Sequence, residues 1–317
     1  MRIPLFNMAL LGGLMVSGTV EAARRDELPD PLSNIHVDKA ILETVERQLP
    51  ERQAIGAAFL DEAYQPTLTL DDPSQLAVTF VSEGAGYRNA VGYFTYEDGT
   101  FDDLTFGDID RNRSGNITAR ELERIEGVEE IDILFANNSA VGSGGRLTTG
   151  DTMVIGGGTI AGGADGWSIS DGTVFDAGTN VGFFLAANAW DGRKVTGFDT
   201  GQDIATYYSL DFLNPENGAD ATVEDVSRST RHVAMLNVSD AHQVLMGFED
   251  LNRNTGDNDF NDAVLIIRSD PYEALDNSPI PTVSAAPLPP IGQGAAGLAM
   301  IASALTLAVR RWRQRRT

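Results

Sequence analysis

The chain has 317 residues, enough for one large domain or two modest ones, and its 23 basic and 46 acidic side chains give a formal net charge of −23. This charge disfavours a nucleic-acid partner, because phosphate binding needs clustered Lys and Arg. The absence of cysteine excludes disulfides, thiolate zinc sites, iron–sulfur clusters and a cysteine nucleophile. Three histidines leave little for a histidine-built centre, and 33 glycines favour a turn-rich β protein.

Residues 1–22 are predicted to be a signal peptide. Arg2 precedes an almost uncharged apolar stretch, and Val20-Glu21-Ala22 places small residues where a signal peptidase cleaves. Two glycines within the stretch and the charged residues directly after it argue against a buried N-terminal helix. The protein is therefore expected to be exported.

Residues 23–75 are predicted to be a helical lead-in. Apolar side chains recur at helical spacing, with Ile41, Leu42, Val45 and Leu49 on one face and a second short run at residues 55–60.

Strand patterns dominate from residue 76 to residue 270. Short apolar or alternating runs are separated by Gly- and Asp-rich turns, at residues 76–81, 90–96, 131–135, 181–187, 232–238, 244–248 and 263–267. Many short strands of this kind predict a mainly β fold, specifically a jelly-roll-like β-sandwich. The glycine-dense stretch 142–178 is expected to form loops and edge strands of it.

Residues 110–121 have the spacing of a 12-residue EF-hand calcium loop. A hard cation needs six or more oxygens, and one short loop supplies them if Gly115 makes the sharp turn at position 6. The predicted ligands at positions 1, 3, 5, 7, 9 and 12 are Asp110, Asn112, Ser114, the carbonyl of Asn116, Thr118 and Glu121. Only two of these are acidic, which predicts weak binding, with a Kd of about 10⁻⁴–10⁻³ M. A polar turn that matches by chance is the alternative.

This loop is expected to be half of an EF-hand, inserted at residues 108–127. The sequence at 101–107 is a poor helix, whereas a helix is predicted over 122–125 and is expected to stop at Gly127.

A second acidic segment lies between two predicted strands. Without a bound ion, four Asp and one Glu in one hairpin loop repel each other strongly, and a divalent cation relieves that repulsion. Oxygen ligands select calcium or magnesium over zinc or copper. The sequence therefore predicts a calcium site formed by Glu249, Asp250, Asp257, Asp259 and Asp262. A solvated acidic turn is the alternative.

The second acidic segment also carries a family resemblance. Residues 248–251 (Phe-Glu-Asp-Leu) and 257–262 (Asp-Asn-Asp-Phe-Asn-Asp) resemble the hallmark of the bacterial surface family called domain of unknown function 4114. Earlier pieces match in family order at residues 81–89, 137–145 and 182–190, so the resemblance spans roughly residues 50–270. It implies a calcium-binding β-sandwich on an exported protein, without an established activity. Glu83 and Asn89 are expected either to approach the acidic loop or to hold a turn.

The C-terminal part is predicted to be a membrane anchor behind a linker. Residues 271–290 are a Pro-rich linker, and residues 291–309 form an uncharged run, about 28 Å long as a helix and so long enough to cross a bilayer. Residues 310–317 form an Arg cluster, which the positive-inside rule keeps in the cytoplasm.

The sequence at 286–290 (Ala-Pro-Leu-Pro-Pro), followed by this span and cluster, resembles the C-terminal sorting signals processed by bacterial exosortases. The closest variant of that signal reads Val-Pro-Leu-Pro-Ala, from which Ala286 and Pro290 depart. The resemblance implies a temporary anchor in the inner membrane, cut when the protein passes to the cell surface or matrix. A permanent single-span anchor is the alternative.

These features predict a non-enzymatic surface or extracellular-matrix protein of a Gram-negative bacterium, with calcium (Ca2+) as its cofactor. Exosortase-type signals accompany exopolysaccharide production, so the implied partner is an exopolysaccharide or another matrix component. A carbohydrate-binding adhesin module is the alternative, favoured if Trp167 or Trp190 is exposed beside a cation site rather than buried in the core. A polysaccharide hydrolase with a carboxylate pair is a further one. His232 and His242 fall in strand patterns and are expected to pack or to lie on the polar surface.

Overall fold

The computed structural model describes residues 33–163, 166–197, 204–238, 243–276 and 278–283. The predicted signal peptide, the membrane span at 291–309, the Arg cluster and His242 lie outside these residues. Among the residues within them, no helix is both long and apolar enough to cross a membrane.

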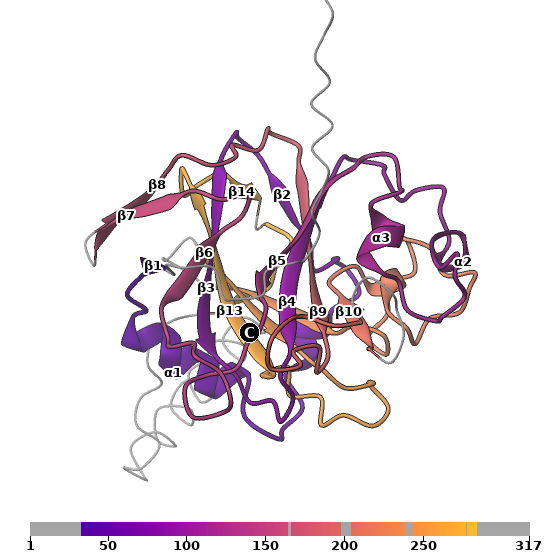
Figure 1. The fold of residues 1–317 in the computed structure, drawn as a ribbon, viewed down its shortest axis with the longest axis horizontal. Coiled ribbons are helices and arrows are strands. Elements are labelled where there is room, and N and C mark those ends of the chain that lie inside the picture. The colour runs from indigo at the N-terminus through magenta and orange to yellow at the C-terminus, as the bar shows by residue number, and fades with distance from the viewer. Residues whose placement is uncertain (1–32, 164–165, 198–203, 239–242, 277, 284–317) are drawn as a thin grey trace, which may run out of the picture.

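The described chain is mainly β, and its largest sheet has seven strands (Figure 1). All neighbours in this sheet pair antiparallel except β11 and β15, which are parallel. In spatial order the strands are β1 (Ser33–Asn34), β6 (Asp151–Val154), β3 (Gln75–Ser82), β13 (Ala263–Asp270), β12 (Gln243–Phe248), β11 (Val233–Val238) and β15 (Thr282–Val283).

A second, six-stranded sheet is antiparallel throughout. Its order is β14 (Leu275–Asp276), β2 (Leu68–Leu70), β9 (Asn180–Ala186), β4 (Ala90–Tyr96) and β5 (Val128–Phe135), with β10 (Thr206–Tyr208) also paired to β9. A separate hairpin consists of β7 (Thr159–Gly163) and β8 (Gly166–Ser170).

The two large sheets share one apolar core. Alternate residues of a strand point to the same face, so Val78 and Phe80 of β3 meet Tyr93 of β4 and Phe183 of β9 in a single buried cluster. The central strands are buried on their other faces as well, which explains why they are almost continuously apolar.

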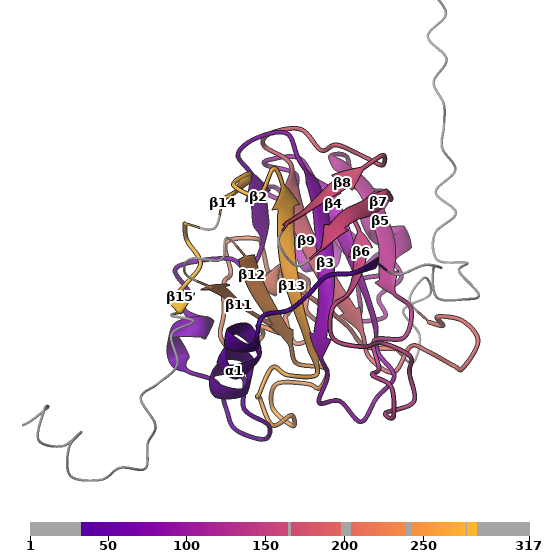
Figure 2. The same ribbon diagram turned by 90° about the vertical axis from the view of Figure 1, so that its left-hand side faces the viewer.

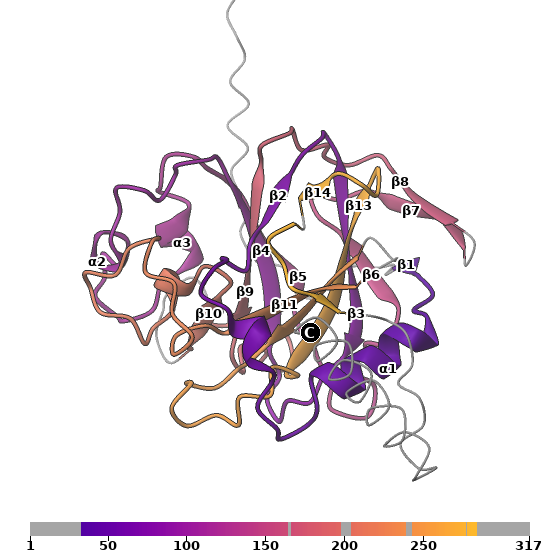
Figure 3. The ribbon, with the colours of Figure 1, turned by 180° about the vertical axis from the view of Figure 1, so that it is seen from behind.

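Different segments cover the two outer faces. Helix α1 (Lys39–Gln48) and the 3₁₀ turn η1 (Ala57–Leu60) lie against the seven-stranded sheet, where Ile41 and Val45 join a cluster with Leu245 and Ile266 (Figure 2). Short helices α2 (Phe106–Ile109) and α3 (Ala119–Leu122), with the 3₁₀ turn η2 (Asp211–Leu213), cover the six-stranded sheet. Figure 3 shows α1 and the α2–α3 pair on opposite sides of the molecule.

The prediction of a mainly β chain with a short N-terminal helix is confirmed, and each of the predicted strand runs forms a strand. Two features differ from expectation. Strands β1 and β2 fall within the segment 23–75, so this segment is built into both sheets rather than preceding them. The glycine-dense stretch contributes β6, which pairs with β3 inside the seven-stranded sheet, and the separate β7–β8 hairpin.

Candidate metal site

The β12–β13 hairpin carries the second acidic segment at one end of the seven-stranded sheet (Figure 2). Phe248 pairs with Ala263, so residues 249–262 form the connecting loop. The loop folds back against β12, because a Cβ atom at Gly247 would lie 2.2 Å from the carbonyl oxygen of Phe260. Only glycine at this position permits such a close approach.

Three acidic side chains converge in this loop. One carboxylate oxygen each from Glu249, Asp257 and Asp259 lie within 4.8 Å of one another; Glu249 and Asp259 are buried and Asp257 is exposed. Gly256 lies so close that a Cβ atom there would stand 2.2 Å from Oε1 of Glu249. The path of the loop brings these carboxylates together although they are spread along the sequence.

Of the three converging carboxylates, Glu249 is in the least favourable environment for a negative charge. Its side chain has no exposed surface, and neither carboxylate oxygen has a hydrogen-bond partner among the residues described. Burial and the repulsion of Asp257 raise the pKa of Glu249 to about 7. An ionised carboxylate in this position is costly unless a cation or a donor reaches it.

Arg253 does not supply that partner. Its guanidinium lies over the ring of Phe260, 4.5 Å from the centroid, and donates to Oδ1 of Asn258. No ion pair joins it to Glu249 within the part of the chain that the structure describes. The two oxygens of Glu249 therefore remain available to a bound cation.

Asp250 and Asp262 lie beside the converging group with partners of their own. Oδ2 of Asp262 accepts the backbone N–H of Asp250 at 2.8 Å, and Oδ2 of Asp250 accepts Nδ2 of Asn89 at 2.7 Å. Burial raises the pKa of Asp250 to about 6, and burial with the charge of Asp250 raises that of Asp262 to about 9. The five predicted acidic ligands thus form two groups: three carboxylates that converge on one point, and the neighbouring pair Asp250 and Asp262.

Two residues from the earlier resembling pieces support this loop. Asn89 donates to Asp250 and also holds turns, since its Oδ1 accepts the N–H of Asn188 at 2.9 Å and its carbonyl accepts that of Asn138 at 2.7 Å. Glu83 holds a turn through its Oε1, which accepts the N–H of Ala140 at 3.3 Å.

His232 is a supporting residue whose role the sequence did not reveal. It is buried, as expected for a packing residue, but its Nδ1 lies 2.9 Å from the carbonyl oxygen of Glu249 and its Nε2 lies 2.9 Å from Oε1 of Glu216. Its ring stacks on Tyr207 with centroids 3.8 Å apart. The available signal was the pair of polar residues Arg231 and His232 directly before an apolar strand.

The donor set fits a hard divalent cation. All the converging ligand atoms are carboxylate oxygens, and neither oxygen of Glu249 has a hydrogen-bond partner among the described residues. Calcium takes six to eight oxygens at about 2.3–2.6 Å, so ligand oxygens on opposite sides of it stand about 5 Å apart. A group of oxygens within 4.8 Å of one another matches that shell.

The EF-hand-like loop lies between α2 and α3, on the far side of the molecule from α1 (Figure 3). Its acidic side chains already have donors. The carboxylate of Asp110 accepts the N–H groups of Ser114 at 3.0 Å and Gly115 at 2.8 Å, while Oε1 of Glu121 accepts that of Asn112 at 3.0 Å. The carbonyl of Asn116 accepts Oγ of Ser114 at 2.9 Å. The loop is curled, but its carboxylates are satisfied, unlike Glu249.

The helices around this loop correct the expectation of a half motif. α2 precedes the loop, because Thr105 and Asp108 form a capping box that starts a helical turn. The helix after the loop is α3 at Ala119–Leu122, not residues 122–125, because Thr118 and Glu121 form a second capping box three residues earlier than expected.

The comparisons with known proteins identify one family. Residues 175–270 match the model described as Domain of unknown function (DUF4114), and this segment contains β9 to β13 with the whole loop 249–262. The resembling pieces at 81–89 and 137–145 lie outside the matched residues. No curated protein and no solved structure matches the chain. Residues 175–270 are thus similar to the DUF4114 family, and the converging carboxylates Glu249, Asp257 and Asp259 all fall within this segment.

Proposed function

We propose that the chain is an exported, non-enzymatic protein of the bacterial cell surface or extracellular matrix, in which Ca2+ bound at loop 249–262 stabilises a jelly-roll-like β-sandwich. The observation that carries this proposal is Glu249, a fully buried carboxylate that lies close to two further acids and whose two oxygens have no hydrogen-bond partner in the part of the chain that the structure describes. A bound cation would attract all three carboxylates and so outweigh the repulsion among them. The two sheets around one core support the sandwich.

The position of the acids indicates what the ion would do. Glu249 follows β12 directly, whereas Asp257 and Asp259 come from the later part of the loop, near the start of β13. An ion held by all three would fasten the two ends of the loop to each other. A ligand that binds only the folded state stabilises it by about 2.7 kcal/mol at a concentration one hundredfold above its Kd.

The location outside the cell rests on the predicted signal peptide at 1–22, the linker at 271–290 and the exosortase-type sorting signal. The net charge of −23 accords with such a location, because an acidic surface attracts cations and keeps proteins apart. The acidic loop 249–262 lies within residues 175–270, the segment that matches the DUF4114 model.

The test is thermal unfolding of the full-length chain in mild detergent, with EGTA and with added Ca2+. Calcium should raise the wild-type Tm by several degrees, because it binds only the folded loop. Glu249→Gln should remove most of this increment while unfolding in EGTA at the same temperature as the wild type or higher, since the amide carries no charge.

Asp110→Asn is the matched control, because it removes one acid from the EF-hand-like loop, and it should retain most of the increment. A wild-type Tm that is the same in EGTA and in Ca2+ would contradict the proposal.

A carbohydrate-binding module is the second candidate. Trp190 is half-buried and lines an open pocket, rather than lying inside the core.

A further inference from the structure

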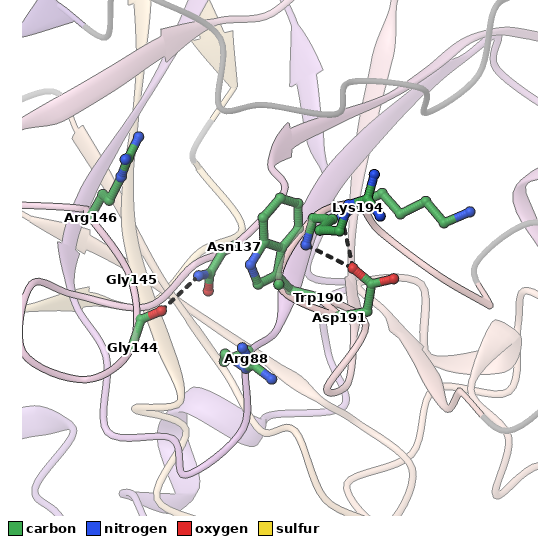
Figure 4. A pocket seen from close by; sticks show the side chains of 10 residues that line it. Arg88, Asn137, Gly144, Gly145, Arg146, Trp190, Asp191 and Lys194 are labelled. Atoms are coloured by element: carbon green, nitrogen blue, oxygen red, sulfur yellow. Dashed lines mark hydrogen bonds between the residues drawn. The ribbon is translucent and has the colours of Figure 1, made fainter.

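A pocket of about 920 Å³ lies on the protein surface among three loops (Figure 4). Arg88 comes from the loop before β4, Asn137 and Arg146 come from the segment after β5, and Trp190, Arg193 and Lys194 come from the segment after β9. Its volume falls in the range of about 300–1,000 Å³ typical of small-molecule sites. The carboxylates of loop 249–262 do not line it.

The pocket gathers positive charge on a strongly acidic protein. Four of the chain's 23 basic side chains line it, namely Arg88, Arg146, Arg193 and Lys194. None of the four forms an ion pair within the described part of the chain. Four unpaired cations in one hollow repel each other, and an anionic ligand would relieve that repulsion.

The acid that lines this pocket, Asp191, is occupied by its own turn. Its Oδ1 accepts the backbone N–H groups of Arg193 at 2.8 Å and Lys194 at 2.9 Å. These hydrogen bonds lower the pKa of Asp191. The carboxylate therefore shapes the turn that carries the two cations and leaves their side chains free to meet a ligand.

Trp190 supplies an apolar surface in a rigid setting. Part of its indole packs against the cluster outside the six-stranded sheet, and the rest lines the pocket between Asn137 and the turn at 191–194 (Figure 4). The backbone N–H of Trp190 donates to the carbonyl of Arg88 at 3.0 Å, and the backbone of Trp190 pairs with that of Val195 across the turn. These contacts fix the backbone that carries the indole beside Arg88.

Two glycines with left-handed backbone lie next to Arg88. Gly144 and Gly192 have φ values of +95° and +101°, which side chains rarely adopt. A Cβ atom at Gly144 would lie 3.7 Å from Cδ of Arg88, and one at Gly192 would lie 3.8 Å from its Nη1. The Arg88 side chain therefore lies between the two loops, and a Cβ atom at either glycine would make only an ordinary van der Waals contact with it.

We infer that this pocket binds an acidic saccharide, with the apolar face of a sugar ring on Trp190 and its carboxylate on Arg88, Arg193 and Lys194. A neutral sugar would leave the positive charges of the pocket without a counter-charge. A small inorganic anion would make little use of the flat aromatic face of Trp190. A nucleic acid would extend beyond the pocket over a protein whose net charge is −23. This inference deepens the matrix role proposed above and does not depend on the calcium site.

The experiment measures binding of two matched tetrasaccharides to the full-length chain by calorimetry. β-1,4-Linked tetraglucuronate and cellotetraose differ only in the carboxylates at C6. Tetraglucuronate should bind at least about tenfold more tightly, because charge-assisted hydrogen bonds form only with the carboxylates. Its affinity should fall as salt is raised, since the cations are exposed.

Matched variants locate the binding. Arg88→Gln and Trp190→Ala should each weaken tetraglucuronate binding about tenfold. Lys39→Gln and Trp167→Ala should change it less than twofold, because these side chains lie outside the pocket. Arg88 is exposed, so its variant is expected to fold even if Trp190→Ala does not; thermal unfolding checks both.

Absence of tetraglucuronate binding, equal binding of the two sugars, or binding unchanged by Arg88→Gln would overturn the inference. Tighter binding of tetrathymidylate than of tetraglucuronate would assign the pocket to nucleic acid instead. Glu249→Gln should retain sugar binding, so a failed calcium site and a failed sugar site give different results.

Discussion

At Glu249, either a proton or a bound cation can neutralise a buried negative charge. A buried carboxylate without a hydrogen-bond partner is stable when it is protonated or when a cation lies beside it. The buried carboxylate of Asp250 is less costly to ionise, because Asn89 donates a hydrogen bond to it. The stability of the loop should therefore depend on pH when no cation is bound.

In EGTA, lowering the pH from 8 to 6 should raise the Tm of the full-length chain. The pKa of Glu249 is raised to about 7 and that of Asp250 to about 6, so the folded state binds protons in this range that the unfolded chain does not. Stability then increases as the pH falls through these values.

Thermal unfolding at several pH values measures this dependence, with Glu249→Gln as the control that should show a smaller slope. Excess Ca2+ should weaken or reverse the trend, because protons compete with the ion. A Tm in EGTA that is constant or decreases between pH 8 and pH 6 would refute the role of these carboxylates.

At the scale of elements, the two loops predicted to bind calcium differ in the hydrogen-bond donors that reach their acidic side chains. The loop at 110–121 turns its own N–H groups towards Asp110 and Glu121 and caps α3 with Thr118. The loop at 249–262 holds its acids against each other, and Gly256 leaves the space into which Glu249 fits. In the loop at 249–262, Asp259 also accepts backbone N–H groups, from Arg52 at 2.7 Å and from Asn261 at 3.2 Å. The two loops therefore differ chiefly in Glu249, whose carboxylate has no donor among the described residues.

Gly256→Ala should remove most of the calcium-dependent rise in Tm. The new methyl group would lie 2.2 Å from Oε1 of Glu249 and must displace that carboxylate from the converging group. Gly218→Ala is the control, because a Cβ atom there meets nothing within 4 Å. Calcium calorimetry on both variants tests the prediction, and unchanged affinity in Gly256→Ala would contradict it.

At the scale of the whole molecule, a buried ion pair joins segments that are distant in sequence. Arg231 precedes β11 and contacts Asp211 of η2 at 2.9 Å, with both side chains fully buried. Its guanidinium also donates to the carbonyls of Asp61 at 2.8 Å and Tyr64 at 2.7 Å. Burial outweighs the attraction of Arg231 and raises the pKa of Asp211 to about 6. The pair ties the N-terminal segment to the sheets.

Arg231→Met should lower the free energy of unfolding by about 3–5 kcal/mol, because it leaves a buried carboxylate and two carbonyls without their donor. The double variant Arg231→Met/Asp211→Asn should lose less than the single variant, since no charge remains unpaired. Urea unfolding measures both. A double variant that is less stable than the single one would show that the unpaired buried charge of Asp211 is not the cause of the loss.

The fold class followed from local patterns. Strands are recognisable where short apolar runs end at Gly and Asp, and the central strands β3, β4, β12 and β13 were predicted almost to their ends. The short strands β1 and β2 escaped prediction, because two or three residues carry no period and their pairing partners are distant in sequence. The capping boxes at Thr105 and Thr118 were readable signals that outweighed the helix propensity of their neighbours.

The sequence by itself determined the mainly β class, the oxygen-rich chemistry of loop 249–262 and the similarity of residues 175–270 to the DUF4114 family, because each depends on residue types at short spacing. Only the tertiary structure decided which acids meet. It placed Asp259 beside Glu249, turned Asp262 towards the backbone of Asp250 instead, and brought Arg88 to Trp190. The physical reason is that these contacts join separate loops, or separate parts of one loop. Their approach is set by the packing of the two sheets and by the glycines that permit it, not by the spacing of the residues along the chain.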